Sequence, residues 1–438
     1  MRKMSWASLS VLLSMIMLST GCISAENDMG LMPKESPVEV EIDKKFSKRD
    51  RKAGYVENMA VNILLNKEEV SIEGDGASLD GNVITIDREG TYVISGIWQD
   101  GRIVVDAGSS DKVQLVFDNI AIACSDNAPI YIRKADKVII TLKEGSENAL
   151  TDGFEYVQTD DNNVDGVIFS KEDLTINGSG TLYITGNYKH GVISKDDLVI
   201  TGGNFHITAV KDALNGKDSV KIKDGIFRLS SKDGNGIQSK NGDDETKGYV
   251  YISGGEITVV DSKEGIEGAA LVIDGGIIDI TARDDGLNAS NADIVINGGI
   301  ITIDARGDGI DSNGSVYVTG GITYVSGPED DDNAGLDYDE SAHISGGIFL
   351  VTGSSSMAQG FSDSSTQQSI LYNLDSVSEA GTEISLIDEQ GNVIISHIPA
   401  KQYQSILIST PDLKKDMTYT LVSGNQREQI AIFPHENP

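Results

Sequence analysis

Basic residues are scarce in this sequence. Lysine and arginine together number 35 against 68 aspartates and glutamates, which gives a formal net charge of −33. Binding to nucleic acid or to an anionic lipid surface depends on clustered positive charge, so the composition argues against both. Aromatic residues make up only 6% of the chain, but a hydrophobic content of 39% is too high for a disordered protein.

Cysteine, histidine and proline are also rare. The two cysteines, Cys22 and Cys124, exclude a disulfide-rich fold, and the five histidines are too scattered for a Cys/His zinc site. Proline occurs 8 times, whereas glycine occurs 48 times. Abundant glycine and aspartate with little proline indicate many tight turns between strands.

The N-terminal apolar stretch is too short to cross a bilayer. It lies between residues 9 and 18 after a short basic region, which is typical of a signal peptide. The sequence then resembles a bacterial lipoprotein signal, in which Cys22 receives lipid, although Ser19 stands where leucine is usual. We expect a lipoprotein signal peptide over 1–21 and a flexible spacer over 22–57. An ordinary secretory signal is the alternative.

One sequence unit recurs through the middle of the chain. Each unit has an Asp-Gly-apolar corner, an alternating strand, a Gly-Gly turn and a second alternating strand. The Gly-Gly turn keeps step with the corner, so the repeat is not accidental. The corner residue recurs at intervals of 21 to 29 residues, at Gly166, Gly191, Ala213, Gly236, Gly265, Gly286, Gly309, Gly335 and Gly360.

Apolar and polar residues alternate on both sides of each Gly-Gly turn. Leu198 and Ile200 precede one such turn, for example, and Phe205 and Ile207 follow it. Alternation places these side chains on one face, and a unit of three short strands cannot enclose a core alone. Stacked units superpose like residues about 4.8 Å apart and do enclose a core. The sequence therefore predicts an all-β fold, a parallel β-helix.

Two other repeat architectures fit less well. The Leu-x-Leu-x-x-Asn/Cys signature of leucine-rich repeats is missing, and propeller blades need about 40 residues. We expect the β-helix domain to cover 58–365, with a looser pattern over 58–163. The Gly-Gly marker then disappears, and residues 366–438 are predicted to form a small C-terminal β cap that covers the open end of the solenoid.

Oxygen-bearing residues flank the corner glycine in consecutive units. One precedes the glycine and another follows it two positions later. Asp and Asn favour tight turns, which explains the first position better than the second. The candidate metal ligands, which we call the acidic corner, are Asp212, Asn215, Asp233, Glu264, Glu267, Asp285, Asn288, Asp308, Asp311 and Asp337.

Stacking brings the carboxylates of the acidic corner close enough to repel one another. At about 4.8 Å the repulsion is roughly 3.5 kcal/mol at an effective dielectric of about 20, and roughly 0.9 kcal/mol in bulk water. Calcium accepts about six to eight oxygen ligands in flexible geometry, whereas magnesium requires stricter geometry. The sequence therefore predicts bound Ca2+ at the acidic corner.

Three segments in order are similar to one bacterial family: Gly90–Gly96, Asp173–Leu182 and Gly191–Leu198. This is the family of secreted, cell-surface carbohydrate-binding β-helix proteins, described for binding cellulose and polygalacturonate. The resemblance covers roughly residues 58–365 and implies a right-handed β-helix, calcium sites and similarity to pectate lyases. It brings no catalytic residue that its motifs place on this sequence. The implied partner is an extracellular polysaccharide.

Three functions stay open on the sequence. We favour a calcium-dependent carbohydrate-binding protein without enzymatic activity. It would be lipid-anchored at the extracellular face of the cell membrane, with no other membrane contact and no nucleic-acid partner. A calcium-dependent lyase of pectate-lyase type is the second, and a structural surface spacer or adhesin is the third. Candidate bases for the lyase are Lys189, Lys195, Lys211, Arg283 and Arg306, and candidate aromatic sugar platforms are Trp98, Tyr188, Tyr324 and Tyr338.

Overall fold

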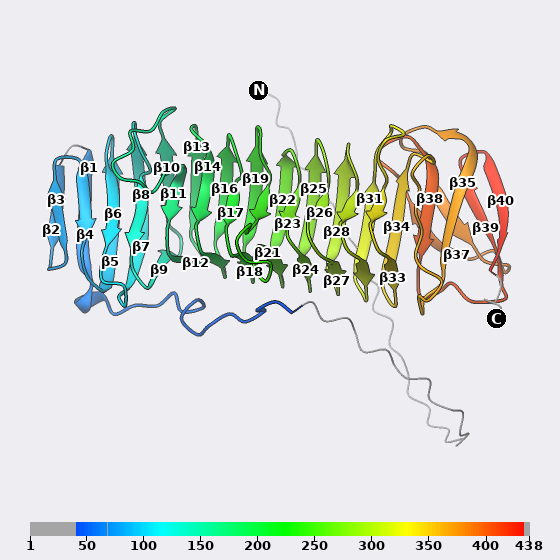
Figure 1. The fold of residues 1–438 in the computed structure, drawn as a ribbon, viewed down its shortest axis with the longest axis horizontal. Coiled ribbons are helices and arrows are strands. Elements are labelled where there is room, and N and C mark those ends of the chain that lie inside the picture. The colour runs from blue at the N-terminus through cyan, green and yellow to red at the C-terminus, as the bar shows by residue number, and fades with distance from the viewer. Residues whose placement is uncertain (1–40, 68, 433–438) are drawn as a thin grey trace, which may run out of the picture. The chain divides into compact units, whose positions relative to one another are not determined.

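The computed structural model describes residues 41–67 and 69–432 as a parallel β-solenoid without an α-helix in that part of the chain (Figure 1). In the regular region each turn has three strands, two in a 24-stranded sheet A and one in a 12-stranded sheet B. Eleven strands of sheet B, from β4 to β32, succeed one another in parallel, so the solenoid has about 11 turns. The predicted parallel β-helix is confirmed.

Sheet B forms one side of every turn. Its strands are β3 (Ala77–Asp80), β4 (Val83–Ile86), β6 (Arg102–Asp106), β8 (Ile130–Lys134), β11 (Gly166–Ser170), β14 (His190–Ser194), β17 (Leu214–Gly216), β20 (Ile237–Ser239), β23 (Ile266–Gly268), β26 (Leu287–Ala289), β29 (Ile310–Ser312) and β32 (Leu336–Tyr338).

Sheet A contains two rows of strands, which become one sheet because the long strand β7 (Lys112–Cys124) pairs with both rows. The first row is β9 (Lys137–Leu142), β12 (Asp173–Gly178), β15 (Asp197–Ile200), β18 (Ser219–Ile222), β21 (Tyr249–Ile252), β24 (Leu271–Ile273), β27 (Ile294–Ile296), β30 (Val316–Val318) and β33 (Ala342–Ile344). The second row is β10 (Glu147–Asp152), β13 (Thr181–Gly186), β16 (Asn204–Ala209), β19 (Ile226–Ser231), β22 (Glu256–Asp261), β25 (Ile277–Ala282), β28 (Ile300–Ala305), β31 (Ile322–Ser326) and β34 (Ile348–Gly353).

The core fills the inside of the coil with apolar residues from all three sides. Like residues stack between turns, as the rings of Phe205 and Phe227 do with centroids 4.8 Å apart and planes 6° apart. The corner glycines allow the turns to approach closely. A Cβ on Gly286 would lie 2.3 Å from Cγ2 of Ile303 and 2.5 Å from the carbonyl oxygen of Gly309, so a larger residue does not fit there.

Antiparallel strands close both ends of the solenoid. At the N-terminal end a 3-10 turn (Glu57–Met59) precedes β1 (Val61–Lys67), which pairs with β2 (Glu69–Glu73) and with β5 (Gly90–Trp98). At the C-terminal end β38 (Tyr403–Ser409) pairs with β34 and with β35 (Ser369–Ser378). The predicted β cap is confirmed, and its small sheet is β36 (Ile384–Ile387), β37 (Val393–His397), β39 (Thr418–Ser423) and β40 (Gln426–Ala431).

Residues 41–56, which we call the N-terminal strap, run along the outer face of the first row of sheet A. Asp43 pairs with Lys221 on β18 at 2.9 Å, and the ring of Phe46 stacks on Tyr251 of β21. Asp50 is 3% exposed and pairs with Lys137 at 2.8 Å. This part of the expected spacer is therefore docked rather than free, because its charges find partners on the sheet. The expected signal peptide and Cys22 lie outside the described residues.

Candidate functional site

The acidic corner is built by the register of sheet B. Parallel pairing places the second oxygen-bearing residue of each turn directly beside its counterpart in the next. Because the strands lie about 4.8 Å apart, one row of polar side chains continues over six turns. In order it contains Asn215, Gln238, Glu267, Asn288, Asp311 and Asp337.

At the N-terminal end of the acidic corner, Asp212 is saturated by hydrogen bonds. It accepts one from the amide side chain of Asn215 at 2.6 Å and one from the backbone N–H of Asn235 at 2.9 Å. The Nδ1 atom of His190 lies 3.2 Å away. Burial alone raises the pKa of Asp212, but His190 and these donors outweigh it, so the pKa is lowered. Asp212 has little free coordinating capacity.

Glu264 and Glu267 lie beside lysine and amide side chains. Lys240 lies 2.9 Å from Glu267, and the amide of Asn235 donates to the same carboxylate at 2.7 Å. Lys263 lies 2.8 Å from Glu264. Burial raises the pKa of Glu264 to about 7 in spite of that lysine, and the charge of Glu267 adds to the rise. Glu267 is thus paired by the protein itself, whereas the charge of Glu264 is only partly compensated.

At the C-terminal end, Asp285, Asp308 and Asp311 form a different arrangement. One carboxylate oxygen from each lies within 4.8 Å of the others. The backbone N–H of Asp308 donates to Asp285 at 2.8 Å, and the amide of Asn288 donates to it at 3.1 Å. Burial and then the neighbouring carboxylates raise the pKa of Asp311 to about 7, and burial is the main cause that raises the pKa of Asp285 to about 6. Their negative charges are therefore crowded and poorly compensated.

These three carboxylates fit a hard cation. They offer carboxylate oxygen atoms from two neighbouring turns. Calcium accepts carboxylate oxygens in flexible geometry. Asp337 lies in register with Asp311 and accepts a hydrogen bond from Gln359, whereas Asp233 is exposed and stands apart. The ten predicted ligands therefore do not form one uniform site.

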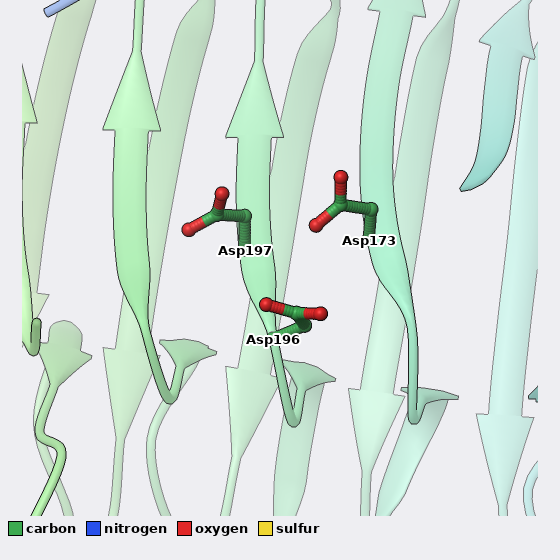
Figure 2. Close-up of side chains that lie close together, drawn as sticks. All are labelled: Asp173, Asp196 and Asp197. Atoms are coloured by element: carbon green, nitrogen blue, oxygen red, sulfur yellow. The ribbon is translucent and has the colours of Figure 1, made fainter. Parts of the chain in front are cut away.

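A second acidic cluster was not among the predicted ligands. Figure 2 shows Asp173, Asp196 and Asp197 at the entry to the neighbouring strands β12 and β15. Burial, followed by the charge of Asp173, raises the pKa of Asp196 to about 6. The hydroxyl of Ser219 donates to Asp197 at 2.6 Å. The signal for this cluster is an acidic residue before Leu174 and before Leu198, at positions away from the corner glycine.

Most of the residues predicted as candidate bases for a lyase contact an aspartate. Lys189 and Lys195 both lie beside Asp165, Lys211 donates to the backbone oxygen of Asp233, and Arg283 pairs with Asp261 at 3.0 Å. Arg306 is exposed.

The predicted aromatic platforms also differ from one another in exposure. Trp98 is 3% exposed and belongs to the core, which explains its position in β5. Tyr324 stacks on His397, Tyr338 donates to the backbone oxygen of Gly360, and Tyr188 stacks on Tyr156. None of the four offers a fully open ring. Within the described residues, no helix is both long and apolar enough to span a membrane.

Comparison with known sequences relates this chain to carbohydrate-binding domain-containing proteins. A family model described as carbohydrate-binding domain-containing protein matches residues 80–271 and 262–395. A carbohydrate-binding domain-containing protein of Acetivibrio thermocellus is 38% identical over 150 residues, which are 34% of this chain and 52% of the relative. The chain thus spans about half the length of that curated relative.

A solved structure is also similar. It is titled as the polysaccharide lyase-like protein from C. thermocellum, gadolinium derivative, and it matches with 31% identity and a TM-score of 0.50. The match covers 59% of this chain and 96% of that one. The similarity agrees with the resemblance drawn from the sequence motifs.

Proposed function

Because the chain belongs to the carbohydrate-binding domain-containing protein family, we propose that it binds an acidic polysaccharide through calcium held at the acidic corner. The observation that supports this proposal best is the cluster of Asp285, Asp308 and Asp311, whose oxygens converge within 4.8 Å while their charges stay poorly compensated. Calcium bound there would relieve that repulsion and keep coordination positions for an external carboxylate.

Bound calcium would also overcome the repulsion between an acidic protein and an acidic polysaccharide. A protein with a net charge of −33 repels a polyuronate such as polygalacturonate, so direct binding over a long contact is unfavourable. A divalent ion between a protein carboxylate and a sugar carboxylate turns repulsion into attraction. The three clustered carboxylates of this chain suit a hard divalent cation of this kind.

Polygalacturonate binding in calcium and in excess EDTA tests the proposal. The Asp308→Asn/Asp311→Asn variant keeps the shape of both side chains and removes two charges, so we expect it to lose calcium-dependent retention. Asp233→Asn is the matched control, since Asp233 is exposed and outside the cluster. Equal retention by the wild-type protein in calcium and in EDTA, or an equal loss in both variants, would contradict the calcium mechanism.

A lyase is the second candidate, and the observation that favours it is the similarity to a polysaccharide lyase-like protein. Incubation with polygalacturonate and calcium separates the two candidates. Growing absorbance of an unsaturated product indicates a lyase, whereas binding without it indicates a carbohydrate-binding protein. Absence of both would favour a structural surface spacer.

Display on the cell surface is part of the proposal. Its support is the lipoprotein-like sequence ending at Cys22. If Cys22 carries the lipid, Cys22→Ser moves the protein from the membrane fraction to the soluble fraction. An unchanged membrane fraction would reject the anchor.

A further inference from the structure

One column of side chains points outward from sheet A, along the second row of strands and along β5 and β7 before it. Parallel register places each side chain of the column beside the next, about 4.8 Å apart. All of them are exposed or half-buried. In order they are Ile97 of β5, Ala121 of β7, Ala149 of β10, Tyr183 of β13, His206 of β16 and Arg228 of β19.

Within this column, His206 supports the ring of Tyr183. The two rings stack with centroids 5.0 Å apart and planes 13° apart. That separation is close to the strand spacing of about 4.8 Å, so the rings stack along the axis of the solenoid. One face of the Tyr183 ring is therefore covered by His206, and the opposite face is turned toward Ala149. Tyr183 is 42% exposed. A ring already fixed by a neighbour loses little conformational entropy when a ligand binds.

Two alanines leave the second face of the Tyr183 ring open. Ala149 and then Ala121 lie next to Tyr183 in register, and a methyl group is too short to cover a tyrosine ring. The next residue of the column is Ile97, which is 52% exposed. Three strand spacings, about 14 Å, separate Ile97 from Tyr183. The two alanines thus form the floor of a notch, which we call the alanine notch, with Tyr183 as one wall and Ile97 as the other.

A second tyrosine–histidine stack on sheet A lacks such a notch. Tyr317 stacks on His343 with centroids 5.4 Å apart and planes 8° apart. The residue in register on the other side of Tyr317 is Val295, which is 3% exposed and packs in the same apolar cluster. His343 and Val295 therefore lie against the two faces of that ring. The open face of Tyr183 depends on the small side chain of Ala149.

Polar side chains border the alanine notch on both sides. Thr151 and Thr185 lie on one side of it, and Glu147 and Thr181 lie on the other. Within the described residues, none of these four side chains makes a hydrogen bond or an ion pair, and neither does the hydroxyl of Tyr183. These groups are therefore free to exchange hydrogen bonds with the hydroxyls of a ligand.

The charges around the alanine notch favour an uncharged ligand. The carboxylate of Glu147 borders the notch and has no cationic partner among the described residues. Lys143 is paired with Asp118 at 2.5 Å. Arg228 lies three strand spacings from Ala149, about 14 Å, on the far side of the tyrosine–histidine stack. A uronate in the notch would therefore meet an unpaired carboxylate at its border, which repels it.

We propose that the alanine notch binds one uncharged pyranose residue of a polysaccharide, whose apolar face lies on the open face of Tyr183. A pyranose ring has C–H groups on its faces and hydroxyls at its edge, which matches an aromatic wall bordered by free polar groups. The choice of a sugar rests on the carbohydrate binding proposed above, but not on calcium. The acidic corner lies on sheet B, so the alanine notch on sheet A is a separate site.

Calorimetric titration of the full protein in excess EDTA with cellohexaose, mannohexaose and xylohexaose tests the inference. We expect at least one of the three to bind. Tyr183→Ala should weaken that binding by about fivefold to tenfold, as the loss of one ring contact implies. Ala149→Ile keeps the tyrosine but fills the notch against its open face, so the loss should be at least as large. Tyr183→Phe keeps the ring and should bind more tightly than Tyr183→Ala.

The chain offers a matched control for each change. Tyr317→Ala is the control for the lost ring, because Tyr317 also stacks on a histidine but has Val295 against its other face. Thr258→Ile is the control for added bulk. Thr258 belongs to the same outward column and lies beside Arg228, three strands beyond Tyr183. Both control variants should bind the hexasaccharide as the wild-type protein does.

Several results would overturn the inference. They are no binding of any of the three hexasaccharides, wild-type affinity in Ala149→Ile, an equal loss in Tyr183→Ala and Tyr317→Ala, or equally tight binding of hexagalacturonate in EDTA. If Ala149→Ile melts early, Tyr183→Ala still decides, because an exposed side chain contributes little to folding. Calcium-dependent retention of polygalacturonate is measured on the same variants and should not change, so the proposed function at Asp308 and Asp311 stands or falls separately.

Discussion

The backbone N–H of Asp308 donates a 2.8 Å hydrogen bond to the carboxylate of Asp285 on the preceding turn. This contact directs one carboxylate toward the next turn, where Asp308 and Asp311 add their own. The solenoid thus repeats the same oxygen-bearing position from turn to turn, and it brings carboxylates together where neighbouring turns both carry them. The protein itself compensates the charge of Glu267, whereas it leaves the charge of Asp311 poorly compensated.

The crowded carboxylates predict an unusual pH dependence of stability in EDTA. Burial and neighbouring charges raise the pKa of Asp311 to about 7 and that of Asp285 to about 6, above the value of about 3.9 for an unfolded aspartate. A carboxylate whose pKa is raised by folding destabilises the folded state when ionised, and this cost disappears as the pH falls through the folded pKa. The melting temperature in EDTA should therefore be higher at pH 6 than at pH 8.

Thermal unfolding followed by circular dichroism at both pH values checks this expectation. Asp308→Asn/Asp311→Asn should reduce the dependence and leave the part due to Glu264, whose pKa is also raised to about 7. The exposed control Asp233→Asn should keep the full dependence. Saturating calcium should also reduce the pH dependence of the melting temperature, because a bound ion would compensate the carboxylate charge that protons otherwise neutralise. A wild-type melting temperature that rises from pH 6 to pH 8 in EDTA would show that these carboxylates are not crowded in solution.

The solenoid could be predicted from the sequence because every turn places apolar residues at the same inward-facing positions. Leu214 and Ile237 follow two successive corners, and both are fully buried in the shared core. Within the cap, β35 pairs with β38 and β40 pairs with β39, and the corner repeat predicts neither pairing. Their place is set by the end of the solenoid rather than by their own pattern.

The sequence predicts which residues of the candidate site lie side by side, but not which of their charges the protein compensates. The corner repeat correctly aligns Asp285, Asp308 and Asp311 on neighbouring turns. It does not reveal that Lys240, in the longer connection after β20, pairs with Glu267 of the following turn. Because the turns differ in length, such contacts join residues whose separation in the sequence the repeat does not predict.

Docking of the N-terminal strap depends on Asp50. This aspartate is 3% exposed, pairs with Lys137 at 2.8 Å and accepts from the hydroxyl of Thr175 at 2.9 Å. Its replacement leaves the buried ammonium of Lys137 without its close partner, which costs about 3 kcal/mol. Asp50→Ala should therefore release the strap, and hydrogen exchange over 41–56 should accelerate by about 100-fold.

The strap experiment has a surface control. Asp87 pairs with Arg88 at 3.0 Å, but both side chains are more than half exposed. Asp87→Ala removes an ion pair of negligible strength, so exchange over 41–56 should match the wild-type protein. Unchanged exchange in Asp50→Ala would mean that other contacts, such as Phe46 on Tyr251, hold the strap instead.

The corner glycines limit how closely the turns can stack. A Cβ on Gly286 would lie 2.3 Å from Cγ2 of Ile303 and 2.5 Å from the carbonyl oxygen of Gly309, and backbone cannot give way as a side chain does. Gly286→Ala should therefore force two turns apart and destabilise the protein by about 1–3 kcal/mol, the usual cost of overpacking. Gly242→Ala is the matched control, because a Cβ there meets no atom within 4 Å and the glycine has no positive φ.

Chemical denaturation of the two alanine variants beside the wild-type protein makes the comparison. We expect the Gly286→Ala midpoint to fall and the Gly242→Ala midpoint to stay or rise slightly, because alanine restricts the unfolded chain. Since Gly286 follows Asp285 directly, the displaced turn should also weaken calcium binding at the acidic corner. A Gly286→Ala protein with wild-type stability would show that the turns have room to separate, and the close stacking on which the carboxylate cluster depends would then be wrong.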